Sequence, residues 1–149
     1  MKWILTFLLV FFLAVSAARS AELPSDTYCL ALNLYHEARG EDASGVLAVG
    51  NVVLNRVQSK RFPNTICKVV KQGGQRRYKC QFSWYCDGRS DKAKDKAAWQ
   101  EMVWLARKLL DGSIADNTSG ALFYHTSNVN PYWNIKMTPK VRLGVHIFY

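Results

Sequence analysis

The stretch Tyr35-His36-Glu37-Ala38-Arg39-Gly40-Glu41 decides where the first helix of the domain ends and what it presents there. Glycine tolerates the left-handed conformation that often follows a last helical turn, so Gly40 predicts a helix over about residues 26–39. Ser25 is a good N-cap for this helix, because its hydroxyl can accept a backbone N–H of the first turn. Glu37 therefore lies in the last turn.

Glu37 also lies on an apolar face, because Leu34 and Leu30 precede it by three and seven positions. Partial burial disfavours a charged carboxylate, and the negative end of the helix dipole acts in the same direction, so both raise the pKa of Glu37. A carboxyl group that keeps its proton beside a cleft can protonate a glycosidic oxygen. The alternative is an exposed Glu37 that pairs with Arg39 or Lys60.

Apolar periodicity predicts further elements along the chain. The expected helices run from Asp42 or Ser44 through Arg56, from Ile66 to Lys71 and from about Lys92 to Leu110, and the expected strands cover 80–86, 121–125 and 140–147. We expect the second helix to be the buried centre, with Gly50 allowing another helix to approach closely. Trp99 and Trp104 are expected to pack in the core.

Two stretches have the composition of a sugar-binding surface. In the predicted strand 80–86, Gln81 and Ser83 face one side, while Phe82 and Trp84 face the other. Hydroxyl groups need hydrogen-bond partners and sugar rings need flat apolar surface, so this pattern suits a carbohydrate cleft. The loop 126–133 is the second candidate. Each stretch has a plainer interpretation, as a polar edge that faces water.

Residues 1–21 have the pattern of a secretory signal peptide, with a basic start, an apolar run and small residues near its end. The run is short for a membrane span of about 20 residues, which makes a retained anchor the weaker alternative. We expect residues 22–149 to form one soluble domain, periplasmic or secreted, without a membrane span. The chain carries a net charge of +9, which suits an anionic wall polymer, and export argues against nucleic acid. Arg76-Arg77-Tyr78-Lys79 is a candidate contact for such a polymer, or only a solvated edge.

The four cysteines are expected to form two disulfides, because an even number in an exported chain favours cross-links. They are Cys29, Cys67, Cys80 and Cys86. Three pairings are possible and the spacing does not choose between them. Zinc is the alternative, but the chain has no C-x-x-C pair and three histidines, so we expect no metal and no other cofactor.

Common enzyme motifs are missing from the sequence. His36-Glu37 does not begin an H-E-x-x-H zinc motif, because Gly40 stands where the second histidine would be. There is no G-x-S-x-G elbow and no Walker loop. Glycosidases commonly use two carboxyl groups, and the candidates for a second are Glu41, Asp42, Asp87 and Asp91. A route with one acid exists if the 6-hydroxyl of N-acetylmuramic acid attacks its own anomeric carbon.

Several segments, in order along the chain, resemble the SleB/CwlJ-type cell-wall hydrolases, the family of the spore cortex-lytic enzymes. They are 32–41 with its E-A-R-G-E signature, 52–57, 62–66, 80–83, 121–124 and 144–149. The resemblance implies a mainly helical, lysozyme-like α+β domain with a small antiparallel sheet. The four cysteines and the lack of a separate wall-binding domain are more similar to exported forms of Gram-negative bacteria than to a germination enzyme.

The resemblance also implies a function and a set of site residues. The expected enzyme is a monomeric lytic transglycosylase that cleaves peptidoglycan glycan strands between N-acetylmuramic acid and N-acetylglucosamine, with Glu37 as the general acid and base. Gln81, Ser83 and Tyr124 are expected in the cleft. We add Asn130 and Trp133 as sugar contacts. Simple hydrolysis and a non-catalytic wall-binding protein are the alternatives.

Overall fold

The structure of the protein is a computed structural model, and it describes residues 22–149. The predicted signal peptide, residues 1–21, lies outside this range. The elements in chain order are α1 (Ser25–Ala38), α2 (Ala43–Gln58), α3 (Ile66–Val70), the 3₁₀ helix η1 (Ser83–Cys86), α4 (Lys96–Leu110), β1 (Tyr124–Thr126), the 3₁₀ helix η2 (Tyr132–Lys136), β2 (Val141–Leu143) and β3 (His146–Phe148). None of the helices within residues 22–149 has the length and apolar character needed to cross a bilayer.

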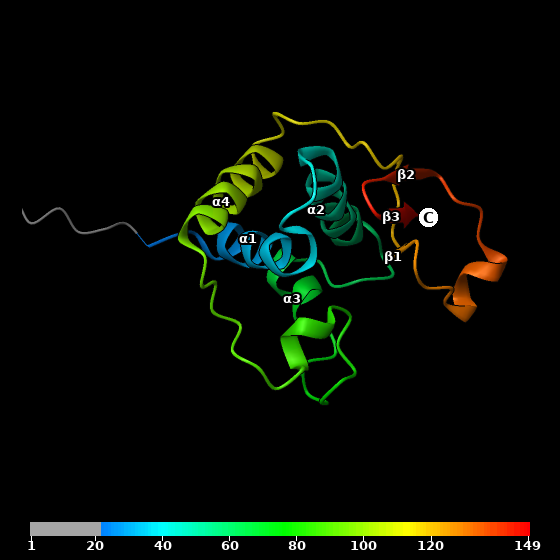
Figure 1. Cartoon of the computed structure of the whole chain (residues 1–149), viewed down its shortest axis with the longest axis horizontal. Helices are drawn as coiled ribbons and strands as arrows, with labels where there is room; N and C mark the ends of the chain where they lie inside the picture. The colour runs from blue at the N-terminus through cyan, green and yellow to red at the C-terminus, as the bar shows by residue number, and fades with distance from the viewer. Residues whose placement is uncertain (1–21) are drawn as a thin grey trace, which may run out of the picture.

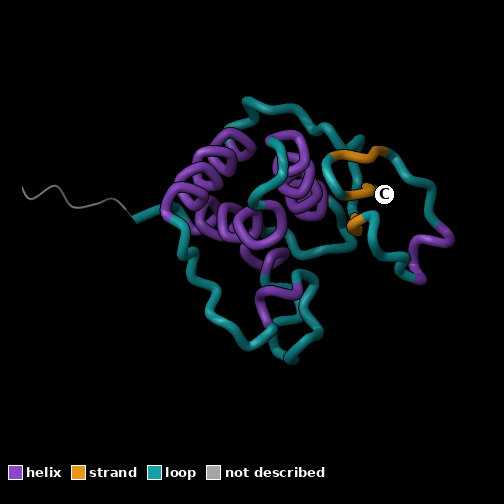
Figure 2. The backbone as a smooth tube through the Cα atoms, in the orientation of Figure 1, coloured by secondary structure: helices purple, strands orange, loops and turns teal. Residues whose placement is uncertain are grey.

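The helices lie on one side of the molecule and the small sheet lies on the other, with α2 nearest to the sheet (Figure 1). The three strands are antiparallel in the order β1-β3-β2, so the last strand of the chain is central. The loop between α4 and β1, residues 111–123, joins the two parts along the upper side (Figure 2). The predicted α+β fold, mainly helical with a small antiparallel sheet, is confirmed.

The core is built on α1, which packs against α2, α3 and α4. Leu30, Leu34 and Tyr35 are fully or almost fully buried, so α1 shares the central position that we expected for α2 alone. The tight approach predicted at Gly50 is present, because a Cβ atom there would collide with Leu109 of α4. Because Gly50 has no Cβ atom, α4 can lie directly on α2.

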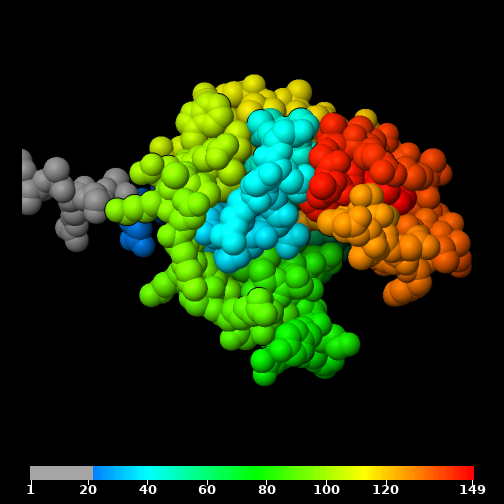
Figure 3. All heavy atoms as spheres, viewed as in Figure 1, coloured from blue at the N-terminus to red at the C-terminus, as the bar shows by residue number. Residues whose placement is uncertain are grey.

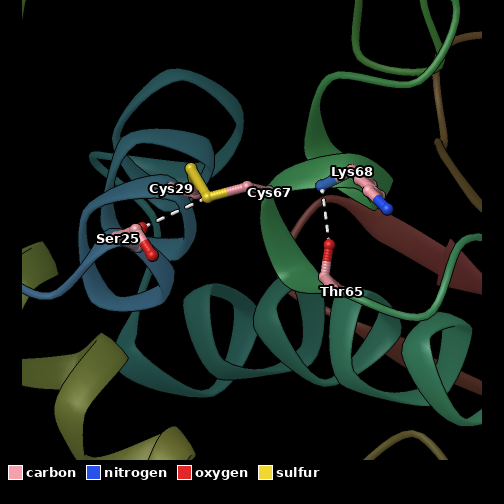
Figure 4. The surroundings of a disulfide bond; sticks show 5 residues. All are labelled: Ser25, Cys29, Thr65, Cys67 and Lys68. Atoms are coloured by element: carbon pink, nitrogen blue, oxygen red, sulfur yellow. Dashed lines mark hydrogen bonds between the residues drawn. A yellow bond between two sulfur atoms is a disulfide. The ribbon is translucent and has the colours of Figure 1, made fainter.

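The prediction of two disulfides is confirmed, and the structure gives their pairing. Cys29 of α1 is bonded to Cys67 of α3, and Cys80 is bonded to Cys86. Figure 4 shows the first bond between the two helices, with Thr65 at the start of α3. The Thr65 hydroxyl accepts the backbone N–H of Lys68 at 3.4 Å, which caps this short helix.

The strand predicted over 80–86 is wrong, because this segment bends into η1 (Ser83–Cys86). Seven extended residues would separate the two ends by about 20 Å, whereas the Cα atoms of Cys80 and Cys86 lie 6.0 Å apart. The disulfide therefore excludes the strand. The expected sidedness survives, since Phe82 and Trp84 are buried while Gln81 and Ser83 are exposed.

The single closing strand predicted over 140–147 is a hairpin of β2 (Val141–Leu143) and β3 (His146–Phe148). Gly144 forms the turn with φ +56°, a conformation that favours glycine. The turn reverses the facing of the side chains in β3. His146 and Phe148 are buried, and Val145 is 51% exposed, contrary to the alternation read from the sequence.

The first residues of two helices differ from expectation, as do the exposure of a tryptophan and the length of a strand. Helix α1 begins at Ser25 itself, so Pro24 occupies the N-cap position. Helix α4 begins at Lys96 rather than near Lys92 because the backbone N–H groups of Lys94 and Asp95 donate to the buried Tyr35 hydroxyl, at 3.1 and 3.0 Å. Trp104 is 57% exposed and is not part of the core. Trp99 is half-buried. The strand predicted over 121–125 is shorter in the structure, where β1 covers Tyr124–Thr126.

Candidate active site

A cleft of about 260 Å³ lies where the helices meet the sheet. It is lined by Glu37, Arg56, Cys80, Gln81, Phe82, Ser83, Tyr124, His125, Thr126, Val129 and His146. A larger hollow of about 750 Å³, beside Tyr28 and Trp99, lies at the opposite end of α1 from Glu37. The smaller cleft is the candidate active site, because the predicted acid and the polar groups of four separate segments converge there.

Glu37 lies in the last turn of α1 and is half-buried, as its helical position predicts. Its Oε2 atom accepts a hydrogen bond of 2.9 Å from the Tyr124 hydroxyl. Burial raises the pKa of Glu37 above its ordinary value, and the Tyr124 hydrogen bond and the nearby His146 and Arg56 oppose this rise. Arg39 does not pair with Glu37, since its guanidinium lies over the Tyr35 ring at 4.4 Å.

Tyr124 enters the cleft from the first residue of β1. Its ring packs edge-on against His146, with centroids 5.0 Å apart, and lies 5.5 Å from the Phe148 ring. Burial, followed by the charge of Glu37, raises the pKa of Tyr124 well above its ordinary value. The phenol therefore stays protonated and remains a hydrogen-bond donor to Glu37.

Arg56 is a buried cation in the cleft wall, with a side chain that is 2% exposed. Its Nε donates a hydrogen bond of 2.8 Å to the Leu122 carbonyl, and its guanidinium lies 5.0 Å from the Phe62 ring and 5.3 Å from the Phe82 ring. Burial lowers the pKa of Arg56 to about 10, so the group remains charged at neutral pH. Its positive charge favours the carboxylate form of Glu37.

Glu41 does not line the cleft, but it contacts His146, which does. Its Oε1 lies 3.0 Å from His146 Nδ1, and its Oε2 accepts the backbone N–H of Val145 at 3.3 Å. Gly45 and Gly144 flank this carboxylate, and a Cβ atom at Gly45 would lie 2.6 Å from Oε2. Figure 3 shows the corresponding contact between the cyan surface near residue 41 and the red C-terminal surface. Glu41 is thereby committed to His146 and the hairpin turn.

The other acids considered as second carboxyl groups do not line the cleft. Asp42 caps α2 by accepting the Gly45 N–H at 2.9 Å. Asp87 accepts the Arg89 N–H at 2.8 Å. Asp91 contacts His36 through its backbone carbonyl, at 2.9 Å, and not through its carboxyl group. Among the described residues that line the cleft, Glu37 is the one with a carboxyl group.

The predicted sugar contacts are divided between two places. Gln81, Ser83 and Tyr124 line the cleft together with Glu37. Asn130 and Trp133 do not line it: Asn130 accepts a hydrogen bond from Asn134 at 3.0 Å, and the half-buried Trp133 packs against the rings of Phe123, His125 and Tyr149. No cluster of three or more metal-binding side chains occurs within residues 22–149.

Arg56 and His146 are cleft residues that the sequence did not single out as site residues. Asn55-Arg56, at the end of the second predicted helix, has two equal interpretations from the sequence: polar groups near the cleft or a solvated helix end. His146 was placed on the polar face of a single strand. A Gly-x pair read as a hairpin turn at Gly144 would have placed His146 on the buried face.

The arrangement of a half-buried acid between a helical part and a small antiparallel sheet defines the lysozyme-like class of α+β domain. The chain belongs to the cell wall hydrolase family, whose sequence profile matches residues 40–149. Glu37 precedes this matched range by three residues.

Individual relatives agree with this family. A spore cortex-lytic enzyme of Halalkalibacterium halodurans is 30% identical over 125 residues, which are 83% of this chain and 34% of the relative. That of Bacillus cereus is also 30% identical, over 83% of this chain and 44% of the relative. The chain thus spans less than half the length of these relatives.

Solved catalytic domains have the same fold. The SleB catalytic domain from Bacillus cereus has a TM-score of 0.61 at 26% identity, and the alignment covers 89% of this chain and 98% of that domain. The catalytic domain of the germination-specific lytic transglycosylase SleB from Bacillus anthracis has a TM-score of 0.66 at 28% identity, over 87% and 98% of the two chains.

Proposed function

We propose that this protein is a lytic transglycosylase that cleaves peptidoglycan glycan strands between N-acetylmuramic acid and N-acetylglucosamine. The observation that carries the proposal is that Glu37 is the single carboxyl group among the described residues lining the cleft. Plain hydrolysis by the common routes uses two carboxyl groups. The similarity to enzymes named for spore cortex lysis and lytic transglycosylation supports the same conclusion.

In the proposed reaction, the protonated Glu37 donates its proton to the glycosidic oxygen as the bond to the anomeric carbon breaks. The leaving sugar departs as an alcohol, and positive charge develops on the muramic acid ring. The 6-hydroxyl oxygen of that ring then bonds to the anomeric carbon, and the Glu37 carboxylate takes the hydroxyl proton. Glu37 ends protonated, no water is consumed, and the product carries a 1,6-anhydro ring.

The neighbouring residues have roles that follow from their contacts. Tyr124 donates a hydrogen bond to Oε2 of Glu37, and Oε1 is the oxygen that we propose to act on the substrate. Gln81 and Ser83 are exposed in the cleft and offer hydrogen bonds to sugar hydroxyls. Asn130, next to the lining residue Val129, is proposed as a contact at the rim, and Trp133 as a flat surface beyond it. We propose an exported, monomeric domain that needs no cofactor, with residues 1–21 as its leader.

The test is digestion of purified sacculi, followed by mass spectrometry of the released fragments. Lytic transglycosylation gives anhydro ends, which are lighter by one water than the reducing ends produced by hydrolysis. Glu37→Gln, which keeps the shape of the side chain, should abolish release, whereas Glu101→Gln on the exposed face of α4 should not. Reducing ends alone would establish hydrolysis instead. Sedimentation with sacculi and no release by the unmodified protein would indicate a binding protein.

A further inference from the structure

Residues 71–79, here called the basic lobe, carry four positive charges and no negative charge: Lys71, Arg76, Arg77 and Lys79. All four side chains are exposed. Among residues 22–149, the structure records no ion pair for any of them. Green atoms, the colour of residues in this part of the chain, protrude at the lower edge of the molecule in Figure 3. The positive charge of the lobe is therefore available to an external anion.

The basic lobe has a defined shape. Tyr78 adopts φ +59° and is 65% exposed, a left-handed conformation that non-glycine residues rarely adopt. Its backbone N–H donates to the Cys86 carbonyl at 3.2 Å. The Arg77 guanidinium lies 4.8 Å from the Tyr78 ring and also against Gly88, where a Cβ atom would be 2.8 Å from Nη2. One exposed guanidinium is thus positioned before any ligand arrives.

A hollow of about 480 Å³ lies within the basic lobe and is lined by Lys71, Gly73, Gly74, Gln75, Arg76 and Tyr85. Two of these residues are cations and none is an acid. The ring of Tyr85 occupies the space that a side chain at Gly74 would need. Backbone therefore forms this part of the hollow's wall. The hollow offers positive charge and backbone, which suits a short ligand that ends in a carboxylate.

The basic lobe is continuous with the wall of the candidate active site. It leads directly into Cys80-Gln81-Phe82-Ser83, which lines the cleft. The backbone N–H of Gln81 donates to the Gln72 carbonyl at 2.9 Å, and the Cys80–Cys86 disulfide closes the base of the same loop. A polymer that lies in the cleft therefore has the lobe beside it.

We propose that the basic lobe binds the carboxylates of the peptides that a peptidoglycan strand carries on its muramic acid residues. This inference rests on the proposed function, which places a glycan strand in the cleft, and it adds a feature of that substrate. The sugars would contact Gln81 and Ser83, while the peptide carboxylates would contact Arg76, Arg77 and Lys79. Charge complementarity would then favour strands that still carry their peptides.

The test measures binding to sacculi by sedimentation, in a Glu37→Gln background that leaves the sacculi intact. One variant carries Arg76→Gln, Arg77→Gln and Lys79→Gln. The matched control removes the same number of charges at exposed positions of α4 and the residues before it, as Lys94→Gln, Lys96→Gln and Arg107→Gln. Each protein is tested on native sacculi and on sacculi whose carboxyl groups have been converted to amides, at low and at high salt.

The lobe variant should bind native sacculi about 10-fold more weakly than the control at low salt, since each exposed ion pair contributes up to about fivefold. The difference should shrink at high salt. On amidated sacculi the lobe variant and the control should bind equally. Equal binding of both to native sacculi overturns the proposal, as does a lobe effect that persists after amidation, which would indicate phosphate or sugar. Release of fragments in the Glu37→Gln background would instead contradict the proposed function.

Discussion

The hydroxyl of Tyr124 donates a hydrogen bond of 2.9 Å to Oε2 of Glu37, across 87 positions of sequence. This contact joins the last turn of α1 to the first residue of β1. The helical part and the sheet therefore meet at the group that we propose as the acid. Because burial keeps Tyr124 protonated, the contact acts on Glu37 as a fixed donor throughout the pH range in which Glu37 titrates.

Replacing Tyr124 with phenylalanine should slow turnover and move the pH dependence. Loss of one hydrogen bond that orients the acid is expected to reduce kcat about 5- to 30-fold. The same bond lowers the pKa of Glu37, so without it the protonated form persists to higher pH. The alkaline limb of the pH–rate profile should therefore move to higher pH. Tyr132→Phe, at an 87% exposed position, is the control. An unmoved limb would show that Tyr124 does not act on the acid.

Glu37 should make stability depend on pH. Its pKa is raised in the folded protein, so between the unfolded pKa of about 4.3 and the higher folded pKa the native state binds more protons. Stability is then lost as pH rises through this window. Glu37→Gln removes the loss, so its gain in unfolding free energy should be larger at pH 7 than at pH 3. Denaturant titrations at both values measure this, and a gain independent of pH is the contrary result.

Glu41 is expected to act through His146 rather than on the substrate. Glu41→Gln removes the charge that holds His146 Nδ1 at 3.0 Å, and His146 packs on Tyr124. Loss of such an orienting partner is expected to lower kcat about 10-fold, with KM within about twofold. Glu101→Gln removes an exposed acid of α4 and should leave both constants unchanged. Equal kinetics for the two variants would make Glu41 a purely structural residue.

Arg56 is predicted to affect both stability and the titration of the acid. Arg56→Met leaves the Leu122 carbonyl without its donor and should destabilise the fold by about 2–3 kcal/mol. It also removes a charge that lowers the pKa of Glu37, so the alkaline limb should move to higher pH. Arg56→Lys keeps the charge and should restore the limb more fully than the stability. The idea fails if Lys and Met shift the limb equally.

The two disulfides should contribute unequally. The Cys29–Cys67 bond spans 38 residues and the Cys80–Cys86 bond spans 6, so the loss of chain entropy predicts about 4 and about 2 kcal/mol. Replacing each pair with alanine and measuring urea unfolding tests the order. The second pair should nonetheless affect sugar binding more, since Gln81 and Ser83 lie inside its loop. The reverse order of stability would indicate strain or residual structure in the unfolded chain.

The sequence predicted best the features that a single helix determines. Helix α1 and the position of Glu37 followed from Gly40 and the leucines on the same face. The close approach at Gly50 followed from one glycine in an apolar helix. Periodicity reports which face of an element is buried, and for these helices the buried face was the one that packs.

The sequence was least informative where a specific bond, contact or turn, and not periodicity, decides the local structure. The Cys80–Cys86 bond turned a predicted strand into η1, and its pairing was one of three possibilities. The Tyr35 hydroxyl, not local propensity, holds residues 94 and 95 outside α4. His146 entered the cleft through a turn at Gly144 that reversed the alternation. Of these three, the Tyr35 contact joins residues about 60 positions apart, whereas the disulfide and the turn are local features that apolar periodicity does not report.

The carboxylate of Glu41 occupies the space where Gly45 would carry a side chain. In a helix interior alanine is more stable than glycine by about 1 kcal/mol, and Gly45, in the first turn of α2, gives up part of this stability to make room for the acid. The two sites should therefore covary among homologues: lineages that lose the glutamate should acquire alanine at position 45 more often than those that retain it.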